Sequence, residues 1–258
     1  MNADQTTDDR QDSSDETHFG FASIPLGRKQ ALVDDVFHKV ASRYDLMNDL
    51  MSGGVHRIWK RFTIELSGVR KNNAVLDIAG GTGDLAARFA QLVGPEGRVV
   101  LADINESMLQ VGRDKLLDEG RMGNIEFVQA DAQYLPFPDN SFDCITIAFG
   151  LRNVTDKEMA LRSMYRVLKP GGKTVILEFS KPKSFPMKQA YGFYSHVILP
   201  QIGKIVSKDN SAYTYLPESV EAFPDGENFL TILKKVGFHS TLCKPLTFGI
   251  SSIYVGQK

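Results

Sequence analysis

The chain has 258 residues, of which 42% are hydrophobic and 24% charged, and its formal net charge is −1. This length and composition suit one large globular domain, and glycines and prolines without a period exclude collagen-like and low-complexity proteins. The apolar runs are far shorter than the roughly 20 residues that cross a bilayer. Two cysteines, Cys144 and Cys243, are too few for a disulfide framework. We expect a soluble, cytoplasmic protein.

The charge is distributed unevenly along the chain. Residues 1–17 contain six acidic residues and one arginine, with almost no apolar side chain, and this composition predicts a disordered tail rather than a targeting peptide. Residues 18–258 are mildly basic. That basicity is too weak to indicate a nucleic-acid partner, but it is compatible with an anionic membrane surface.

The first part of the predicted domain, residues 28–70, has an amphipathic helical pattern. Val33, Val36, Phe37 and Val40 recur at spacings of three and four, which place them on one helix face. We expect this segment to form a helical lid.

From Asn73 onward, strand-like and helical segments alternate. Five aliphatic runs predict strands at 74–79, 98–103, 125–130, 144–149 and 174–179. Helical stretches lie between them at 84–92, 107–119 and 157–168, the last ended by the KPGG segment Lys169–Gly172. Because parallel strands need crossover helices, the alternation predicts a doubly wound, mostly parallel α/β core over residues 71–180.

The segment that follows this core interrupts the alternation. Residues 181–222 are rich in aromatic residues and prolines and indicate an inserted cover. Residues 223–258 then predict a C-terminal helix at 227–236 and two strand-like runs at 239–246 and 249–257. No linker indicates a second domain.

A glycine-rich loop joins the first strand of the core to its first helix. Gly81, Gly83 and Ala86 fit the pattern G-x-G-x-x-A, and Asp103 ends the next strand at the spacing expected for an acid that contacts ribose. The pattern fits a dinucleotide site, and it also fits a turn that only packs helix against strand.

Three further features favour a different cofactor. Asp77 precedes the glycines inside the strand, where a carboxylate suits an ammonium group better than a pyrophosphate. Asp131 and Ala132 follow the third strand, at the sheet edge where ligands of α/β folds bind. With the KPGG segment, these features resemble class I S-adenosylmethionine-dependent methyltransferases, which have a Rossmann-like fold. An NAD(P) oxidoreductase and a non-catalytic scaffold are the alternatives.

Four more segments resemble the ubiquinone/menaquinone biosynthesis C-methyltransferase family over residues 28–258. They are YDLMND from Tyr44, SGGVHRIWK from Ser52, FGLRNV from Phe149 and LEFSKP from Leu177. The resemblance implies that a methyl group moves from S-adenosylmethionine to a ring carbon of a prenylated hydroquinone, without a metal. The alternative is another small-molecule S-adenosylmethionine methyltransferase. Neither benzoquinol nor naphthoquinol is preferred by the sequence.

The resemblance also assigns cofactor contacts to Thr82, Asp103, Asp131 and Ala132, and we add Asp77, Gly81 and Gly83 from the loop itself. At a further family position, often serine, this chain has Ala148. A methyl group makes no hydrogen bond, so we expect no cofactor contact there.

Candidate catalytic residues follow from the chemistry. A ring carbon is a poor nucleophile until the neighbouring phenol, with a pKa of about 10, loses its proton. Arg152 could stabilise the phenolate or order a water, or it could pair with Asp156 as a structural residue. Asn153 could bind the second ring oxygen, or cap the next helix.

Three other residues are weaker candidates. Asp84 could act as or orient a base, although an acid at a helix start is also favoured by the dipole. Tyr44 could cover the ring from the lid, or simply end a helix. His56 is a lone histidine, which is more often structural.

A basic, aromatic segment runs from Arg166 to Lys208. It contains eight basic residues and one acid, interleaved with apolar residues. We expect either a core helix with a solvated lysine face or an access route for an isoprenoid tail at the cytoplasmic face of the inner membrane. A homodimer or a quinone-biosynthesis complex is left open.

Overall fold

The structure is a computed structural model. It describes residues 16–19, 22–25, 28–29, 31–33, 49, 52–198, 201 and 211–258. Among these residues, no helix has the length and apolar character needed to cross a membrane.

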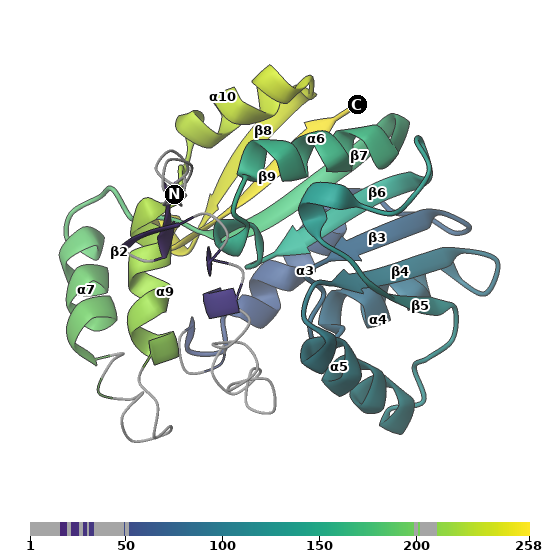
Figure 1. Ribbon diagram of the computed structural model, residues 1–258, viewed down its shortest axis with the longest axis horizontal. Helices are drawn as coiled ribbons and strands as arrows, with labels where there is room; N and C mark the ends of the chain where they lie inside the picture. Colours follow the sequence, from purple (N-terminus) through teal and green to yellow (C-terminus); the bar gives the residue numbers. More distant parts are fainter. Residues whose placement is uncertain are drawn as a thin grey trace, which may run out of the picture.

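A seven-stranded sheet forms the centre of the molecule (Figure 1). Its strands in spatial order are β5 (Ile125–Gln129), β4 (Arg98–Asp103), β3 (Ala74–Ile78), β6 (Phe142–Ala148), β7 (Leu168–Phe179), β9 (Ser251–Gln257) and β8 (His239–Leu246). Strands β5 to β7 pair in parallel, whereas β9 is antiparallel to both of its neighbours. The five predicted core strands are therefore confirmed, and the two C-terminal runs extend them into a mixed sheet.

Helices cover both faces of this sheet. One face carries α3 (His56–Ser67), α4 (Asp84–Val93) and α5 (Glu106–Asp118), whose Trp59, Phe89 and Leu116 pack into one core. The other face carries α6 (Lys157–Val167) and α10 (Glu227–Val236), which bury Met164 and Phe229 in a second core. This is the doubly wound arrangement that the alternation predicts.

The KPGG segment behaves differently from the prediction in one respect. Helix α6 ends at Val167, as expected, but β7 begins directly at Leu168. Pairing with β6 shifts register, since Leu168 faces Phe142 and Lys173 faces Cys144. The proline and glycines of KPGG thus lie within the long strand β7, where they cause the register shift, and they do not form a separate loop.

The N-terminal region is described only in part. Strands β1 (Glu16–Phe19) and β2 (Ala22–Pro25) form an antiparallel hairpin, so the predicted tail boundary at residue 17 falls inside a strand. The rest of the predicted tail, residues 1–15, lies outside the described residues. Within the predicted lid, the described part is helical at 28–29, 31–33 and in α3.

Between β7 and α10 the chain forms the segment predicted as a cover. Its described elements are α7 (Met187–Phe193), the π-helical turn η4 (Tyr194–Ile198) and α9 (Ser211–Ala222). Figure 1 shows α7 and α9 together at one side of the sheet. Helix α9 contacts the turn η3 (Leu151–Asn153) that follows β6, so this segment lies against the carboxyl end of the sheet.

Candidate functional site

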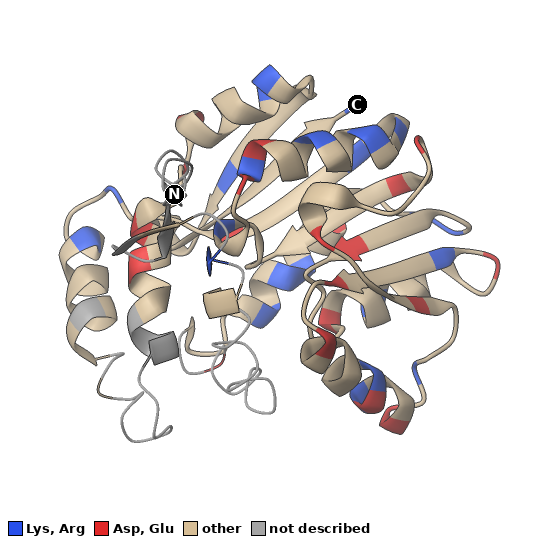
Figure 2. Cartoon of the chain, in the orientation of Figure 1, with Lys and Arg blue, Asp and Glu red and all other residues tan. Residues whose placement is uncertain are grey.

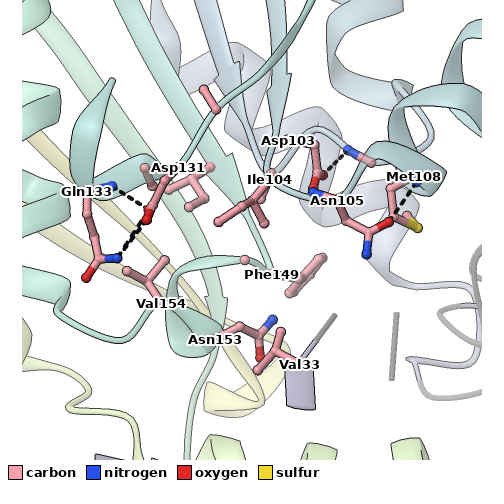
Figure 3. A pocket seen from close by; sticks show the side chains of 16 residues that line it. Val33, Asp103, Ile104, Asn105, Met108, Asp131, Gln133, Phe149, Asn153 and Val154 are labelled. Carbon is pink, nitrogen blue, oxygen red and sulfur yellow. Dashed lines mark hydrogen bonds between the residues drawn. The ribbon is translucent and has the colours of Figure 1, made fainter. Parts of the chain in front are cut away.

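A cavity opens where strands β3 to β6 end. Its empty space, including the solvent-facing mouth, is about 710 Å³. Figure 3 shows three groups of side chains around it. Asp131 and Gln133 lie on one side, Asp103, Asn105 and Met108 on the other, and Val33, Phe149 and Asn153 below.

The two positive-φ glycines of the loop have different surroundings. Gly81 has φ +54° and lines the cavity. Gly83, with φ +82°, caps α4, and a Cβ added to it would lie 2.7 Å from Leu116 Cδ1. Gly81 therefore belongs to the cavity wall, whereas Gly83 allows the close packing of α5 against the loop.

Asp103 fastens two loops together at the cavity. One carboxylate oxygen accepts the backbone N–H of Gly81 at 3.0 Å, and the other accepts that of Asn105 at 3.0 Å. The side chain is buried at the end of β4. A carboxylate held in this way can accept the paired hydroxyls of a ribose.

Asp131 and Ala132 line the cavity after β5, as predicted. The Asp131 carboxylate accepts the backbone N–H of Gln133 at 2.8 Å and also its side-chain Nε2. Gln133 Oε1 in turn accepts the backbone N–H of Asp156 at 2.9 Å. Gln133 was not predicted as a site residue, although it stands two residues after Asp131, where an Asx turn forms.

A second, smaller hollow adjoins this cavity. It measures about 340 Å³ with its open mouth and is lined by nine residues: Lys60, Asp77, Ala79, Gly80, Thr82, Asp84, Leu85, Ala148 and Phe149. Ala79 and Phe149 line both spaces. The predicted cofactor residues Asp77 and Thr82 therefore lie in the hollow, beside the cavity rather than in it.

Asp77 is a buried acid within β3. Its Oδ1 accepts the Thr146 hydroxyl at 2.7 Å. Burial raises the pKa of Asp77 to about 7, although the nearby Lys60 opposes this shift. The carboxylate is thus costly to ionise unless a cation meets it.

Asp84 lies at the first position of α4, between two ammonium groups. Lys60 Nζ contacts its Oδ2 at 2.7 Å and Lys115 Nζ its Oδ1 at 2.9 Å. Burial works against ionisation, but the two lysines outweigh it and hold the pKa of Asp84 well below its ordinary value. Such a carboxylate is a weak base.

Lys60 was not predicted as a site residue, although it stands four residues after His56 in the quoted HRIWK segment and so shares its helix face. His56 itself is buried, and its Nδ1 lies 2.8 Å from the Ser52 hydroxyl. Burial lowers the pKa of His56. It does not line the cavity, and its contacts agree with a structural histidine.

The turn after β6 has an unusual backbone. Phe149 has φ +58° and Ala79, at the end of β3, has φ +50°. Such values are uncommon for residues with a side chain and concentrate at functional sites. A Cβ on Gly150 would lie 2.5 Å from that of Ala79, so the two turns touch.

Arg152 is buried beneath this turn instead of facing the cavity. Its Nη1 contacts Glu178 Oε1 at 3.0 Å, and its backbone N–H donates to Glu178 Oε2 at 3.1 Å. The guanidinium also donates to the Phe149 carbonyl and to Ser219 Oγ. Asp156, the partner considered from sequence, instead caps α6.

Asn153 lines the cavity, and its Oδ1 accepts the hydroxyl of Tyr215 at 3.0 Å. The helix that follows is capped by Asp156, so Asn153 is not the helix cap. Of the other predicted residues, Tyr44 lies outside the described part of the chain. The described residues contain no group of three or more His, Cys, Asp or Glu side chains that could hold a metal ion.

Together these residues fit a nucleoside that carries an amino acid. The cavity offers the Asp103 carboxylate, the Asp131 turn and apolar walls, and the adjoining hollow offers a buried cation and a buried acid. This donor set suits S-adenosylmethionine.

Solved structures share the fold. A putative S-adenosyl-L-methionine-dependent methyltransferase from Methanococcus maripaludis superposes with a TM-score of 0.60 at 20% identity, covering 86% of this chain and 93% of that one. The [4+2]-cyclase SpnF superposes with a TM-score of 0.62 at 17% identity, covering 88% of this chain and 95% of that one. Because SpnF is described as a cyclase, the fold by itself does not settle the reaction.

Curated relatives are much closer in sequence. A protein of Pseudomonas entomophila (strain L48) named "Ubiquinone/menaquinone biosynthesis C-methyltransferase UbiE" is 60% identical over 242 residues, 94% of each chain. Its namesake in Pseudomonas fluorescens (strain SBW25) is 59% identical over 254 residues, 98% of this chain and 99% of that one. The sequence profile of the ubiE/COQ5 methyltransferase family matches residues 26–258. The chain therefore belongs to the ubiE/COQ5 methyltransferase family.

Proposed function

We propose that this protein transfers a methyl group from S-adenosylmethionine to a ring carbon of a prenylated hydroquinone, in ubiquinone or menaquinone biosynthesis. The observation that carries the proposal is a cavity at the carboxyl ends of β3 to β6, in a chain about 60% identical over nearly its whole length to proteins named for that reaction. The substrate class comes from those relatives.

In this proposal the residues around the cavity position the cofactor. Asp103 binds the ribose hydroxyls, and the Asp131–Ala132 turn meets the adenine. Phe149 and Ala79 stand where cavity and hollow join, which is where we place the sulfonium. Alignment of the methyl group with the ring carbon at about 3 to 3.5 Å then supplies most of the acceleration.

The acceptor ring must be activated as a phenolate. Asn153 is our candidate for a contact with a ring oxygen, because its side chain lines the cavity and Tyr215 fixes its orientation. We assign Arg152 to holding the turn that presents Asn153, and Asp84 to holding Lys60. The lowered pKa of Asp84 argues against direct proton transfer. Tyr44 keeps its proposed place over the ring.

The experiment is a methyl-transfer assay on reduced and oxidised substrate. Only the quinol can yield the phenolate, so we expect turnover with a strong reductant and none with fully oxidised quinone. In parallel, Asp103→Ala should weaken S-adenosylmethionine binding by about 2 kcal/mol, since it leaves the ribose hydroxyls without an acceptor. Equal rates on both oxidation states, or unchanged cofactor affinity, would contradict the proposal.

We also propose that the segment around α7 contacts the cytoplasmic face of the membrane, where a prenylated substrate resides. Phe185 and Phe193 are 80% and 60% exposed, and residues 181–193 carry three lysines and no acid. Helix α7 carries one basic residue and no acidic one (Figure 2). Apolar side chains beside lysines suit an anionic lipid surface.

Flotation with anionic vesicles tests this contact. Replacing Phe185 and Phe193 together by serine should reduce the membrane-bound fraction. Leu117→Ser, on the distant helix α5 with 64% exposure, is the control and should change nothing. Equal flotation of all three proteins would exclude the α7 segment. The same proposal includes a lid formed by residues 28–70 and a substrate cover formed by residues 181–222.

A further inference from the structure

A further pocket lies among helices α3, α4 and α5, apart from the cavity described above. Its empty space is about 660 Å³ with its open mouth. It shares Asp84 with the small hollow and no residue with the cavity. Of the nine described residues that line it, only Ala87 and Leu116 are apolar. A ring or an isoprenoid tail would find little to pack against there, so the lining suits a strongly polar ligand.

Cationic side chains from three helices and one loop line this space, which we call the basic pocket. They are Arg57 on α3, Arg88 on α4, Lys115 on α5 and Arg121 just after α5, and they face the acids Asp84 and Glu119. His56 also lines the pocket, but burial lowers its pKa, so it adds little charge at neutral pH. Four cations against two acids make the basic pocket positive.

The two acids of the basic pocket already have cationic partners. Asp84 is held between Lys60 and Lys115, and Glu119 Oε2 lies 3.1 Å from Arg121 Nη1. Arg88 is exposed, and among the described residues no ion pair or hydrogen bond engages its guanidinium. Pairing among neighbours therefore explains Lys115 and Arg121 but leaves Arg88 with donors for a ligand.

We propose that the basic pocket binds the phosphate group of a small soluble molecule. Guanidinium groups match phosphate oxygens with paired donors, and cations on several elements can surround a tetrahedral dianion. Helix α3 begins in the pocket at His56 and has neither an acid in its first turn nor a side-chain cap, so the positive end of its dipole adds to the attraction.

The position of the basic pocket favours a soluble phosphate over a lipid headgroup. Figure 1 shows α5 and α7 at opposite sides of the molecule, and α7 is the helix that we place at the membrane. The inference does not rest on the proposed function, because the pocket and the cavity have no lining residue in common.

Calorimetry with inorganic pyrophosphate as the probe tests the basic pocket, first alone and then with saturating S-adenosylhomocysteine, the demethylated form of the cofactor. The parent protein should bind pyrophosphate in both cases. Arg88→Gln should weaken this binding by about tenfold, as for a lost charge-assisted hydrogen bond. Arg113→Gln is the matched control, since it removes the same charge from α5 but does not line the pocket. It should change the affinity less than about twofold at about 0.1 M salt.

Glu119→Gln should act in the opposite direction. It removes an acid from the basic pocket and releases Arg121, so pyrophosphate should bind about 2- to 5-fold more tightly. A gain of affinity cannot come from partial unfolding, which makes this variant a check on the loss in Arg88→Gln.

Four results would overturn the assignment. They are no pyrophosphate binding by the parent protein, loss of that binding when S-adenosylhomocysteine is present, equal effects of Arg88→Gln and Arg113→Gln, and binding no tighter in Glu119→Gln. Flotation with vesicles that contain phosphatidic acid distinguishes the source of the phosphate. Equal flotation of the parent and Arg88→Gln supports a soluble ligand, whereas reduced flotation of Arg88→Gln would assign the pocket to a lipid headgroup and contradict the proposal.

Discussion

Two turns meet at the cavity, and they reach similar backbone shapes by different means. The turn after β3 begins at Ala79 with φ +50°, and the turn after β6 begins at Phe149 with φ +58°. Each is followed by a glycine that allows no side chain, since a Cβ on Gly80 would lie 2.7 Å from Leu101 and one on Gly150 would lie 2.5 Å from Ala79. The backbone of both turns lines the cavity.

Beyond this shared start the two turns differ in what holds them. The β3 turn is held by close contact of backbone with α5, where a Cβ on Gly112 would lie 2.5 Å from the Gly81 carbonyl oxygen. The β6 turn is held by the buried pair of Arg152 and Glu178. A turn shaped by close packing should tolerate changes of charge but not of volume, and a turn shaped by an ion pair should show the opposite response.

Breaking the ion pair should have the largest effect. Arg152→Ala leaves Glu178, whose side chain is wholly buried, without its cation, and the loss of one partner of a buried pair typically costs about 3–5 kcal/mol of unfolding free energy. We also expect kcat to fall by about 10²-fold, the cost of misplacing a group that positions the substrate, with S-adenosylhomocysteine affinity nearly unchanged. Urea unfolding, single-turnover kinetics and calorimetry measure the three quantities.

Glu178→Gln tells whether Arg152 acts on the ring or through the turn. This variant keeps the guanidinium, and Glu178 does not line the cavity. A comparable loss of kcat in Glu178→Gln would show that the pair positions Asn153. Normal turnover in Glu178→Gln together with an inactive Arg152→Ala would instead assign the guanidinium a direct role. Arg152→Lys should rescue only in part, because an ammonium lacks the planar fork.

The two turns also differ in how far the sequence predicts them. The β3 turn was predicted in position and kind, because its glycines mark close packing and the flanking periodicity marks strand and helix. The five core strands and α10 were predicted for the same reason. The place of β8 and β9 in the sheet was not, since their antiparallel pairing with β7 is a long-range choice that short apolar runs do not encode.

The contacts of the β6 turn were not predicted from the sequence. The FGLRN segment marked the correct place, but Arg152 was expected at the cavity with Asp156 as its structural alternative. The partner is Glu178, 26 residues away and on the neighbouring strand β7. Adjacency of parallel strands brings the two together, and neither local spacing nor composition carries that information. Lys60 was missed likewise, because its partners Asp84 and Asp77 lie on other elements.

Adding volume to the β3 turn should have the next largest effect. Gly112→Ala forces α5 away from the Gly81 carbonyl, and overpacking of this kind typically costs about 1–3 kcal/mol. Because Asp103 binds the Gly81 N–H, we also expect weaker S-adenosylhomocysteine binding. Thermal unfolding and calorimetry measure both effects.

Gly192→Ala is the matched control for that change. It also places alanine in a helix, but the added Cβ would meet no atom of the described residues within 4 Å. We expect it to be neutral or to stabilise by up to about 1 kcal/mol. If Gly112→Ala and Gly192→Ala changed the unfolding free energy equally, close packing would not be what holds the β3 turn.

A pH-dependent effect concerns the acid that joins the two strands before these turns. Asp77 joins β3 to β6 through Thr146, and burial raises its pKa to about 7 from an unfolded value of about 3.9. Between these values the folded protein holds a proton that the unfolded chain has released. Asp77 therefore contributes stability that is present below about pH 4 and lost as the pH rises to about 7.

Asp77→Asn removes this titration and keeps the acceptor for Thr146. The unfolding free energy of the variant relative to the parent should therefore rise between about pH 4 and pH 7 and level off above. Asp84→Asn tests a pH dependence of the opposite sign. The pKa of Asp84 is lowered in the folded protein, so Asp84 contributes stability above the unfolded pKa of about 3.9, and this stability is lost as the pH falls further. Urea titrations from pH 3 to pH 8 follow both variants. A flat difference for Asp77→Asn would mean that Asp77 stays ionised in the folded protein, and the β3 turn would then also rest on a buried charge, as the β6 turn does.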